Sequence, residues 1–182
     1  MSYQINVIVE DITDFNFNFF KWHKSDINEH IPVMHKYANE CNHITEFGVR
    51  TGVSTWAWLA SRAKVIRCFD IENVINNLEH HIYSAKDTKK DFTFTCVNTI
   101  ADKLEIEPTD LLFIDTEHTY EQCSKELKMH AHNVRKYLIF HDTTICQELN
   151  KAINEFLQSN KEWKVKEILT NNNGLTVLER IV

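Results

Sequence analysis

Short apolar stretches alternate with amphipathic ones along most of the chain. Five stretches have the length and β-branched or aromatic content of strands: "HITEFGV", "KVIRCFDIE", "FTFTCVN", "TDLLFID" and "KYLIFHD". The fourth has no polar alternation, a pattern typical of a central strand buried on both faces. Strands that alternate with helices predict an α/β fold with a doubly wound, mostly parallel sheet.

Segments with helical periodicity lie between these strands. "STWAWLASR" has the composition of a helix, and Pro32 suits the first turn of a helix that runs to about Glu40. Thr119 and Gln122 have the spacing of a capping box at the start of another helix. Three stripes are expected to face the core: Val74, Leu78 and Ile82; Cys123, Leu127, Ala131 and Val134; Ile145, Leu149, Ile153 and Phe156.

Two further strands are predicted at the end of the chain. "WKVKEIL" and "LTVLERI" are joined by "TNNNG", in which Asn-Gly supplies the positive φ angles of a tight hairpin turn. This hairpin adds an antiparallel strand to the sheet. Residues 1–182 then form a single domain, since 182 residues suffice for one substantial core and are too few for two.

Composition narrows the class of protein. No apolar run approaches the ~20 residues of a membrane span, and "MSYQINVIVED" is acidic, so we expect no membrane contact and a cytoplasmic location. The five cysteines are widely spaced without C-x-x-C, which favours reduced thiols. A net charge of −6 argues against nucleic acid as a partner.

The turn after the first strand, "EFGVRTGVST", holds two of the three glycines in the chain. Glycine allows the backbone to approach a ligand, and the following helix offers free N–H groups. The turn lacks G-x-G-x-x-G and a P-loop lysine, and Glu46 would repel a pyrophosphate. With Asp70 placed to accept from ribose hydroxyls, the ligand implied has a ribose and a positive charge, as S-adenosylmethionine has. The alternative is a tight βα turn with a solvated Asp70.

Three ionisable groups follow the fourth strand: Asp115, Glu117 and His118. The carboxyl edge of such a sheet is where ligands bind. Strands four and five are expected to lie about 4.8 Å apart, so Asp115 and Asp142 at their ends can share a ligand. Glu117 is expected to face solvent. The alternative is that Thr119 caps the helix, Glu117 favours its dipole, and His118 is a polar loop residue.

The ordered segments "ITEFGVRTGVSTWAWLA", "CFDIE", "LLFIDTEHTYEQCSKELKMH", "LIFHDT" and "GLTVLER" resemble the class I S-adenosylmethionine-dependent methyltransferases over about residues 30–182. More narrowly, they are similar to the group of cephalosporin-hydroxylase-like proteins and metal-dependent macrolide sugar O-methyltransferases. The resemblance implies a seven-stranded sheet in the order 3-2-1-4-5-7-6. It also implies a cofactor site, whose expected residues are Glu46, Phe47, Gly48, Gly52, Ser54, Asp70 and Asn98.

The same resemblance implies a metal and a base. Asp115, His141 and Asp142 correspond to the positions that hold magnesium in the group, and His118 to its proposed base, with Asp115 also counted as catalytic. The relatives usually have an acid where this chain has His141, and a Pro-Gly-rich loop where it has "NVRK". Magnesium prefers oxygen ligands, so His141 shifts the expectation toward a softer divalent ion.

Other features have structural interpretations. His80, His81, His130 and His132 are expected at the surface of helices. The aromatic segment "DFNFNFFKWH" lies in an N-terminal extension, residues 1–30, interpreted as a lid over the acceptor site, a cover for a sheet edge, or a surface of a homo-oligomer.

Three functions are compatible with these residues. The first is divalent-metal-assisted O-methylation of a hydroxylated small molecule, with S-adenosylmethionine as the methyl donor. The second is a cofactor-binding module of the same fold that has lost catalysis. The third is a metal hydrolase built on "DTEH" and "HD", which leaves Glu46, Gly48 and Asp70 unexplained.

Overall fold

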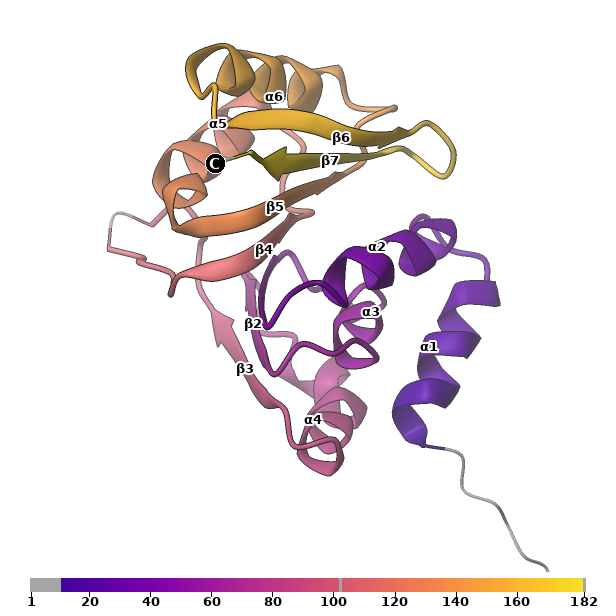
Figure 1. Ribbon diagram of the computed structural model, residues 1–182. Helices are drawn as coiled ribbons and strands as arrows, with labels where there is room; N and C mark the ends of the chain where they lie inside the picture. The colour runs from indigo at the N-terminus through magenta and orange to yellow at the C-terminus, as the bar shows by residue number, and fades with distance from the viewer. Residues whose placement is uncertain (1–10, 102, 182) are drawn as a thin grey trace, which may run out of the picture.

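Seven strands form one mixed sheet in the part of the chain that the computed structural model describes, residues 11–101 and 103–181 (Figure 1). The strands are β1 (His43–Phe47), β2 (Val65–Asp70), β3 (Asp91–Cys96), β4 (Thr109–Ile114), β5 (Val134–His141), β6 (Trp163–Leu169) and β7 (Leu175–Arg180). Their order is β3-β2-β1-β4-β5-β7-β6, with β7 antiparallel to both of its neighbours. The predicted fold class, strand order and closing hairpin are confirmed.

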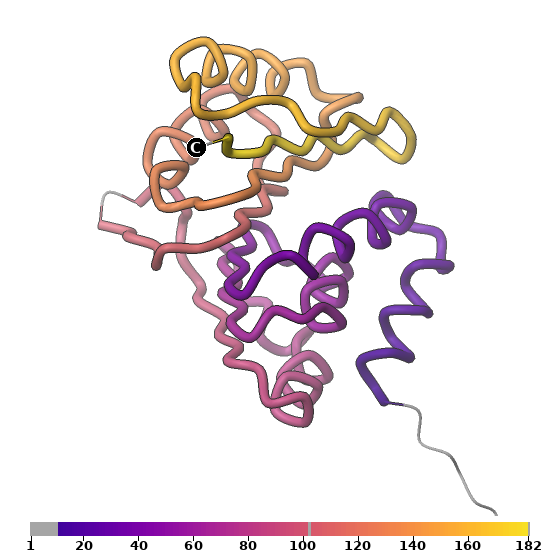
Figure 2. The backbone as a smooth tube through the Cα atoms, viewed as in Figure 1, coloured from indigo at the N-terminus to yellow at the C-terminus, as the bar shows by residue number. Residues whose placement is uncertain are grey.

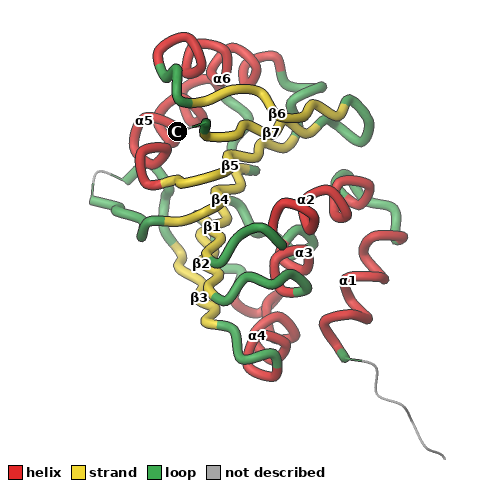
Figure 3. The backbone as a smooth tube through the Cα atoms, in the orientation of Figure 1, coloured by secondary structure: helices red, strands yellow, loops and turns green. Residues whose placement is uncertain are grey.

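Helices cover both faces of this sheet (Figure 3). They are α1 (Ile12–Trp22), α2 (Ile31–Ala38), α3 (Thr55–Leu59), α4 (Glu79–Asp87), α5 (Tyr120–His130) and α6 (Gln147–Ser159), with short 3₁₀ turns η1 (Asn28–His30), η2 (Ile75–Leu78) and η3 (Ala131–Asn133). The first four α-helices lie on one face, and α5 and α6 lie on the other. None of the described helices is both long and apolar enough to cross a membrane.

The central strand β4 has the burial that its sequence predicts. Leu111 and Phe113 belong to the apolar cluster beneath α2 and α3, while Leu112 and Ile114 belong to the cluster beneath α5 and α6. All four side chains are at most 4% exposed. Apolar residues on both faces suit a strand in the middle of a three-layer sandwich. Asp115 follows the last residue of β4 and therefore lies at the carboxyl edge of the parallel strands.

Several predicted helix features hold and others fail. The Thr119 hydroxyl accepts a hydrogen bond from the Gln122 N–H and caps α5, but the Gln122 side chain binds Thr99 and Glu126, so only this half of the predicted capping box is formed among the described residues. Ile82, however, is 43% exposed, because the 3₁₀ turn η2 precedes α4 and its three-residue period breaks the assumed stripe. Ile145 is 61% exposed, because α6 begins only at Gln147.

The amino-terminal segment contains a helix that the sequence analysis did not predict. Asp11 caps α1 by accepting from the Thr13 N–H. Phe20 of α1 stacks on Trp56 of α3, with ring centroids 6.4 Å apart. The helix therefore extends the helical layer on one face of the sheet, while the chain that follows it leads back toward the strand ends.

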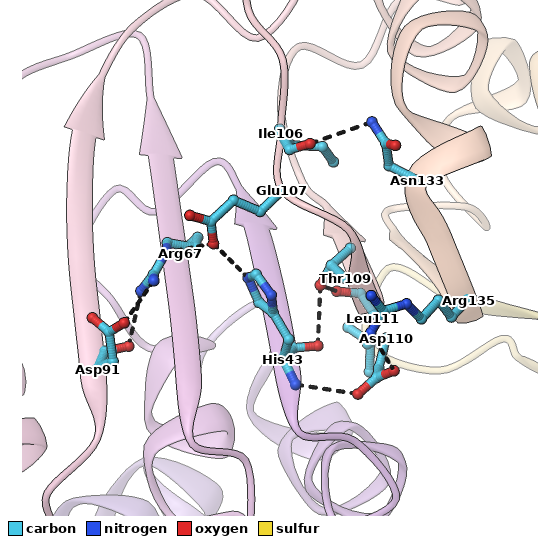
Figure 4. Close-up of polar contacts among 10 residues, drawn as sticks. All are labelled: His43, Arg67, Asp91, Ile106, Glu107, Thr109, Asp110, Leu111, Asn133 and Arg135. Atoms are coloured by element: carbon cyan, nitrogen blue, oxygen red, sulfur yellow. Dashed lines mark hydrogen bonds and ion pairs between the residues drawn. The ribbon is translucent and has the colours of Figure 1, made fainter.

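The amino edge of the parallel strands is held by a charged network (Figure 4). Arg67 of β2 bonds Asp91 of β3 at 2.7 Å and Glu107 before β4 at 3.2 Å. Asp110 accepts from the backbone N–H of His43 in β1. These contacts tie four parallel strands together at the end of the sheet opposite to Asp115, so their role is structural.

Candidate functional site at the carboxyl edge

The turn after β1 passes directly over the end of β4. Gly48 has φ +83°, and a Cβ at this position would lie 1.9 Å from the carbonyl oxygen of Asp115. No side chain fits in that space, so glycine is required by the close approach of two backbones. The contact places the turn after β1 against Asp115, which the sequence analysis identified as a candidate catalytic and metal-binding residue.

Gly52 has a different partner. Its φ is +74°, and an added Cβ would lie 2.5 Å from Nε2 of His81. The His81 N–H donates to the Gly52 carbonyl at 2.8 Å, and its ring stacks on Trp56. The structure thus places Gly52 against a buried histidine. His81 and likewise His130 are at most 3% exposed, so their predicted surface positions are wrong.

Glu46 and Phe47 face the protein interior. The Glu46 carboxylate is completely buried and accepts from Ser54 Oγ at 2.5 Å and Thr55 Oγ1 at 2.7 Å. Burial raises its pKa, against the lowering effect of these hydrogen bonds. Phe47 packs edge-on against Phe69. Glu46 therefore fixes the start of α3, and any effect of these two side chains on a ligand passes through the turn.

Asp70 joins the first two strand ends. Its Oδ2 accepts from the backbone N–H groups of Val49 at 2.8 Å and Arg50 at 2.9 Å, and its Oδ1 accepts from Glu72. Oδ2 already accepts two bonds, but Oδ1 accepts only the one from the Glu72 N–H and retains capacity for a ribose hydroxyl. Asp70 consequently shapes the turn and also lines a cavity above it.

Two adjoining cavities lie over the carboxyl edge. The larger, of about 470 Å³, is lined by Gly48, Arg50, Asp70, Ile71, Glu72, Asn98, Thr99, Asp115, Thr116, Glu117 and Gln122. The smaller, of about 200 Å³, is lined by Asp26, Ile27, Gly48, Val49, Arg50, Thr51, Val53, Ser54, Asp115, Thr116, His118 and Asp142. They share four residues: Gly48, Arg50, Asp115 and Thr116. One elongated ligand can therefore span both. Of the predicted cofactor residues, Gly48, Ser54, Asp70 and Asn98 line one or both.

A buried acid that the sequence analysis missed supports the larger cavity. Glu126 of α5 is 0% exposed, and its carboxylate accepts from Thr99, Gln122 and Thr116. These three partners all line the cavity, so Glu126 holds them in place from behind. Glu126 lies on the same buried side of α5 as Cys123 and Leu127, and this position in the sequence could have indicated a buried acid. A buried carboxylate needs hydrogen-bond partners, so it points to a polar network around it.

Arg50 and Asp26 form an ion pair at the mouth of the site. The Arg50 guanidinium lies 3.0 Å from Asp26 Oδ2, and the Arg50 backbone has φ +49°. The left-handed conformation costs of order 1 kcal/mol or more for a residue with a side chain. The Arg50 carbonyl accepts from Asn77, which helps to hold this conformation. Arg50 lines both cavities, and Asp26 brings the segment after α1 into the smaller one.

Asp115, His118 and Asp142 form a compact ionisable cluster. Each residue offers one atom that could bind a metal ion, and these three atoms all lie within 4.8 Å of one another. His118 Nε2 is 2.8 Å from Asp142 Oδ2 and 3.4 Å from Asp115 Oδ1. The predicted neighbours Asp115 and Asp142 are thus brought together, and Glu117 is exposed as expected, on the rim of the larger cavity.

His141 lies behind this cluster. It is 1% exposed, with Nδ1 at 3.3 Å from Asp142 Oδ2 and Nε2 at 3.2 Å from the Asp26 carbonyl. Nδ1 also lies 3.6 Å from Asp115 Oδ1, so His141 contacts both carboxylates from the buried side, while His118 contacts them from the side of the cavity. His141 thus bridges the carboxylates and the segment that carries Asp26.

The charges of the cluster stabilise one another. Hydrogen bonds to Asp115 and Asp142 raise the pKa of His118 to about 10, and the same two carboxylates, against the effect of burial, raise the pKa of His141 to about 10. Burial opposes ionisation of Asp142, yet the two histidines hold its pKa below the usual range. His118 is therefore protonated at neutral pH when no other cation is bound, and in that state it is not the free base that the resemblance implies.

Comparison with solved structures identifies the fold. A protein of Corynebacterium glutamicum superimposes with a TM-score of 0.70 at 12% identity, over 97% of this chain and 93% of that one. An O-methyltransferase from Bacillus cereus in complex with SAH gives 0.61 at 10% identity, over 97% and 93%. The N-methyltransferase NodS from Bradyrhizobium japonicum gives 0.60 at 13% identity, over 85% and 96%.

The chain has the class I methyltransferase fold. No family model and no curated protein matches the sequence. Because O- and N-methyltransferases share the fold at similar scores, the fold leaves the acceptor atom open. Any inference about the reaction therefore depends on the residues at the carboxyl edge of the sheet.

The buried His81 predicts how stability depends on pH. Burial lowers the pKa of His81 from 6.5 to about 4. The contribution of the neutral imidazole to the free energy of unfolding is therefore complete above pH 6.5 and is lost as the pH falls from 6.5 toward 4. We expect His81→Gln, which can still donate to Gly52, to remove a pH-dependent stabilisation of about 3 kcal/mol. Urea unfolding at pH 7 and pH 4 measures the difference. His80→Gln, at an exposed neighbour, is the control. If His81→Gln and the wild type lost the same free energy of unfolding between pH 7 and pH 4, His81 would not be the source of the pH dependence.

Proposed function

We propose that this protein is an S-adenosylmethionine-dependent methyltransferase that methylates a hydroxyl group of a small molecule with the help of a divalent ion. The observation that carries the proposal is the Asp115, His118 and Asp142 cluster, which lines the cavity next to the one suited to a nucleoside. Methyl donor, acceptor oxygen and cation can then meet at a single point. The SAH named with the Bacillus cereus structure supports the same cofactor class.

The larger cavity suits the adenosine part of the cofactor. Asp70 and Glu72 offer carboxylates to ribose hydroxyls, and Asn98 offers an amide to the base. Ile71, which is 68% exposed beside them, provides an apolar surface for one face of the base. A large exposed isoleucine in a cavity with polar groups on its other walls is typical of a site for a flat, partly apolar ligand.

The smaller cavity suits the amino-acid part. The ion pair between Asp26 and Arg50 presents one negative and one positive group 3.0 Å apart. An α-amino acid carries an ammonium and a carboxylate in adjacent positions. Its ammonium can pair with Asp26 and its carboxylate with Arg50, in place of the pair that these two residues form with each other. The surrounding carboxylates favour the sulfonium, and Arg50 compensates the ligand's own carboxylate.

The cluster also fits a divalent cation. Asp142 has φ +58° and is 5% exposed, and its Oδ1 has no hydrogen-bond partner among the described residues. A buried carboxylate oxygen without a donor is a group that a cation would satisfy. Asp115 and Asp142 would hold the ion, and carboxylate oxygens suit magnesium as well as manganese. Such an ion lowers the pKa of a bound hydroxyl and fixes its position.

His118 is the residue we assign to the acceptor's proton. Its side chain is 39% exposed and lies between the two carboxylates at the cavity surface. As long as both carboxylates bind it, the imidazole remains protonated and cannot accept a proton. With a cation bound to both carboxylates, the cause of the raised pKa of His118 would be removed, and Nε2 would be available as the proton acceptor.

Two alternatives make different demands on the same residues. A cofactor-binding module without catalysis would bind the nucleoside but show no turnover. A metal hydrolase would bind a cation without S-adenosylmethionine, and it would leave the Arg50 and Asp26 pair and the larger cavity without a function. Binding of the demethylated cofactor distinguishes the hydrolase from the other two.

The first test concerns the cation. We expect Asp142→Asn to weaken Mn²⁺ binding at least about tenfold in calorimetry, because an amide is a neutral and weaker ligand than a carboxylate. Glu105→Gln removes the same charge from an exposed position at the other edge of the sheet and should leave the affinity unchanged. Equal affinities for all three proteins would remove the ion from the proposal.

The second test concerns the amino-acid part of the cofactor. We expect Arg50→Ala to weaken S-adenosylhomocysteine about tenfold or more, through loss of a charge-assisted contact worth roughly 1.5–3 kcal/mol. The affinity for 5′-methylthioadenosine, which lacks the amino acid, should change less than about twofold. Arg62→Ala, at an exposed arginine, is the control. If the wild type binds neither nucleoside, the cofactor assignment itself is wrong.

The third test concerns turnover. With labelled S-adenosylmethionine, saturating Mn²⁺ and a panel of hydroxylated acceptors, His118→Ala should lower the rate about 10²- to 10⁴-fold, because it removes a positioned proton acceptor. His132→Ala, at an exposed histidine after α5, should retain wild-type turnover. Near-native activity of His118→Ala would return His118 to a polar loop residue, and absence of turnover in the wild type with all acceptors would favour the inactive module.

A further inference from the structure

Helix α1 has two apolar faces, and the residues that the structure describes cover only one of them. Phe17 and Phe20 pack against the core on the inner face. On the outer face, Phe15, Phe19 and Trp22 are 53%, 45% and 79% exposed. Their spacing of four and three residues places them in one stripe along the helix. Three large aromatic side chains exposed side by side on one short helix are unusual for a surface that faces only water.

The outer stripe is presented by a fixed helix. The Thr13 hydroxyl of α1 is 2.5 Å from the Ser84 hydroxyl of α4, and Phe20 stacks on Trp56 at the other end. Phe15 and Phe19 also stack on each other, with centroids 6.3 Å apart. In Figure 2, α1 lies at the outer edge of the helical layer. The stripe is therefore preformed and accessible to another molecule.

Charges at the two ends of α1 are of opposite sign. Asp11 and Asp14 lie at its amino end, and Lys21, His23 and Lys24 lie at or just after its carboxyl end. Two such helices packed in parallel would place acid beside acid and base beside base. Packed antiparallel, they place each acidic end beside a basic one.

We propose that the outer face of α1 is the interface of a homodimer, in which α1 packs antiparallel against α1 of a second copy. A two-fold axis near Asn18 and Phe19 places Phe15 against the partner's Trp22, and Asp14 beside the partner's Lys24. The interface is isologous, since the same stripe serves both copies. Because an 11-residue helix is only about 16 Å long, the contact is small, and we expect a dissociation constant in the micromolar range.

The charge around the stripe favours a second copy over a membrane. A helix that lies on an anionic bilayer has basic residues beside its apolar face. Here Asp11, Asp14 and Asn18 share the outward face with the aromatic residues, and the chain carries a net charge of −6. With Lys21 over the Trp22 ring at the other end of the helix, the face carries both signs of charge, which match an antiparallel copy at both ends and a uniformly anionic surface at only one.

Sedimentation equilibrium of the full chain from about 1 to 200 µM tests the dimer. We expect the wild type to shift from monomer to dimer across this range, and Phe19→Ser and Trp22→Ser each to weaken association at least about thirtyfold, as loss of a buried aromatic anchor does. Ile168→Ser is the matched control, because Ile168 is 58% exposed on edge strand β6, and it should associate like the wild type.

Three results would overturn the proposal. A wild type that is monomeric throughout the range leaves no dimer. Binding of the monomer to phosphatidylserine vesicles would assign the stripe to a membrane. A dimer that survives Trp22→Ser unchanged would have to use another surface.

A charge exchange tests the antiparallel arrangement separately. Asp14→Lys or Lys24→Glu alone puts like charges together across the axis, so each should weaken association several-fold. The double variant restores opposite charges in an antiparallel pair and should return the dissociation constant to within about threefold of the wild type. Failure of the double variant to recover would rule out this arrangement, with Asp87→Lys on α4 as a charge-reversal control elsewhere.

Discussion

The site depends on one close approach between two backbones. Phe47 at the end of β1 accepts from the Asp115 N–H at 2.9 Å, and the next residue, Gly48, has no room for a side chain against the Asp115 carbonyl. The turn that shapes the cofactor cavity and the residue that begins the ionisable cluster therefore share one wall. A larger residue at position 48 would have to separate them, and the two cavities would no longer meet.

The acidic residues around this contact divide into two groups by their partners. Glu46 and Glu126 are buried, and their oxygens accept from side chains that are neutral, chiefly hydroxyl and amide groups. Asp115 and Asp142 face histidines, and one oxygen of Asp142 has no hydrogen-bond partner in the part of the chain that the structure describes. Carboxylates of the first group hold the site in shape, while those of the second are available to a cation or a ligand.

Much of the fold could be predicted from the sequence because its signals are local or pairwise. The apolar run before Asp115, the alternation of strands with helices, and the Asn-Gly turn each depend on neighbouring residues, and all three have the expected structure. The predicted meeting of Asp115 and Asp142 also follows from strand order alone, since β4 and β5 are adjacent. The 3₁₀ turn before α4 gave no comparable periodic signal, whereas Ile12–Trp22 has apolar residues at helical spacing that the sequence analysis did not interpret as a helix.

The sequence by itself determined which residue types end the parallel strands, and hence that acids and a histidine gather at one edge of the sheet. Only the tertiary structure decided what each of them contacts. It turned Glu46 inward, set both His118 and His141 against the two carboxylates, and brought Asp26 to Arg50 from before α2. The physical reason is that strand position follows from local pattern, whereas the direction and protonation of a side chain depend on partners that are distant in sequence and on the burial they share.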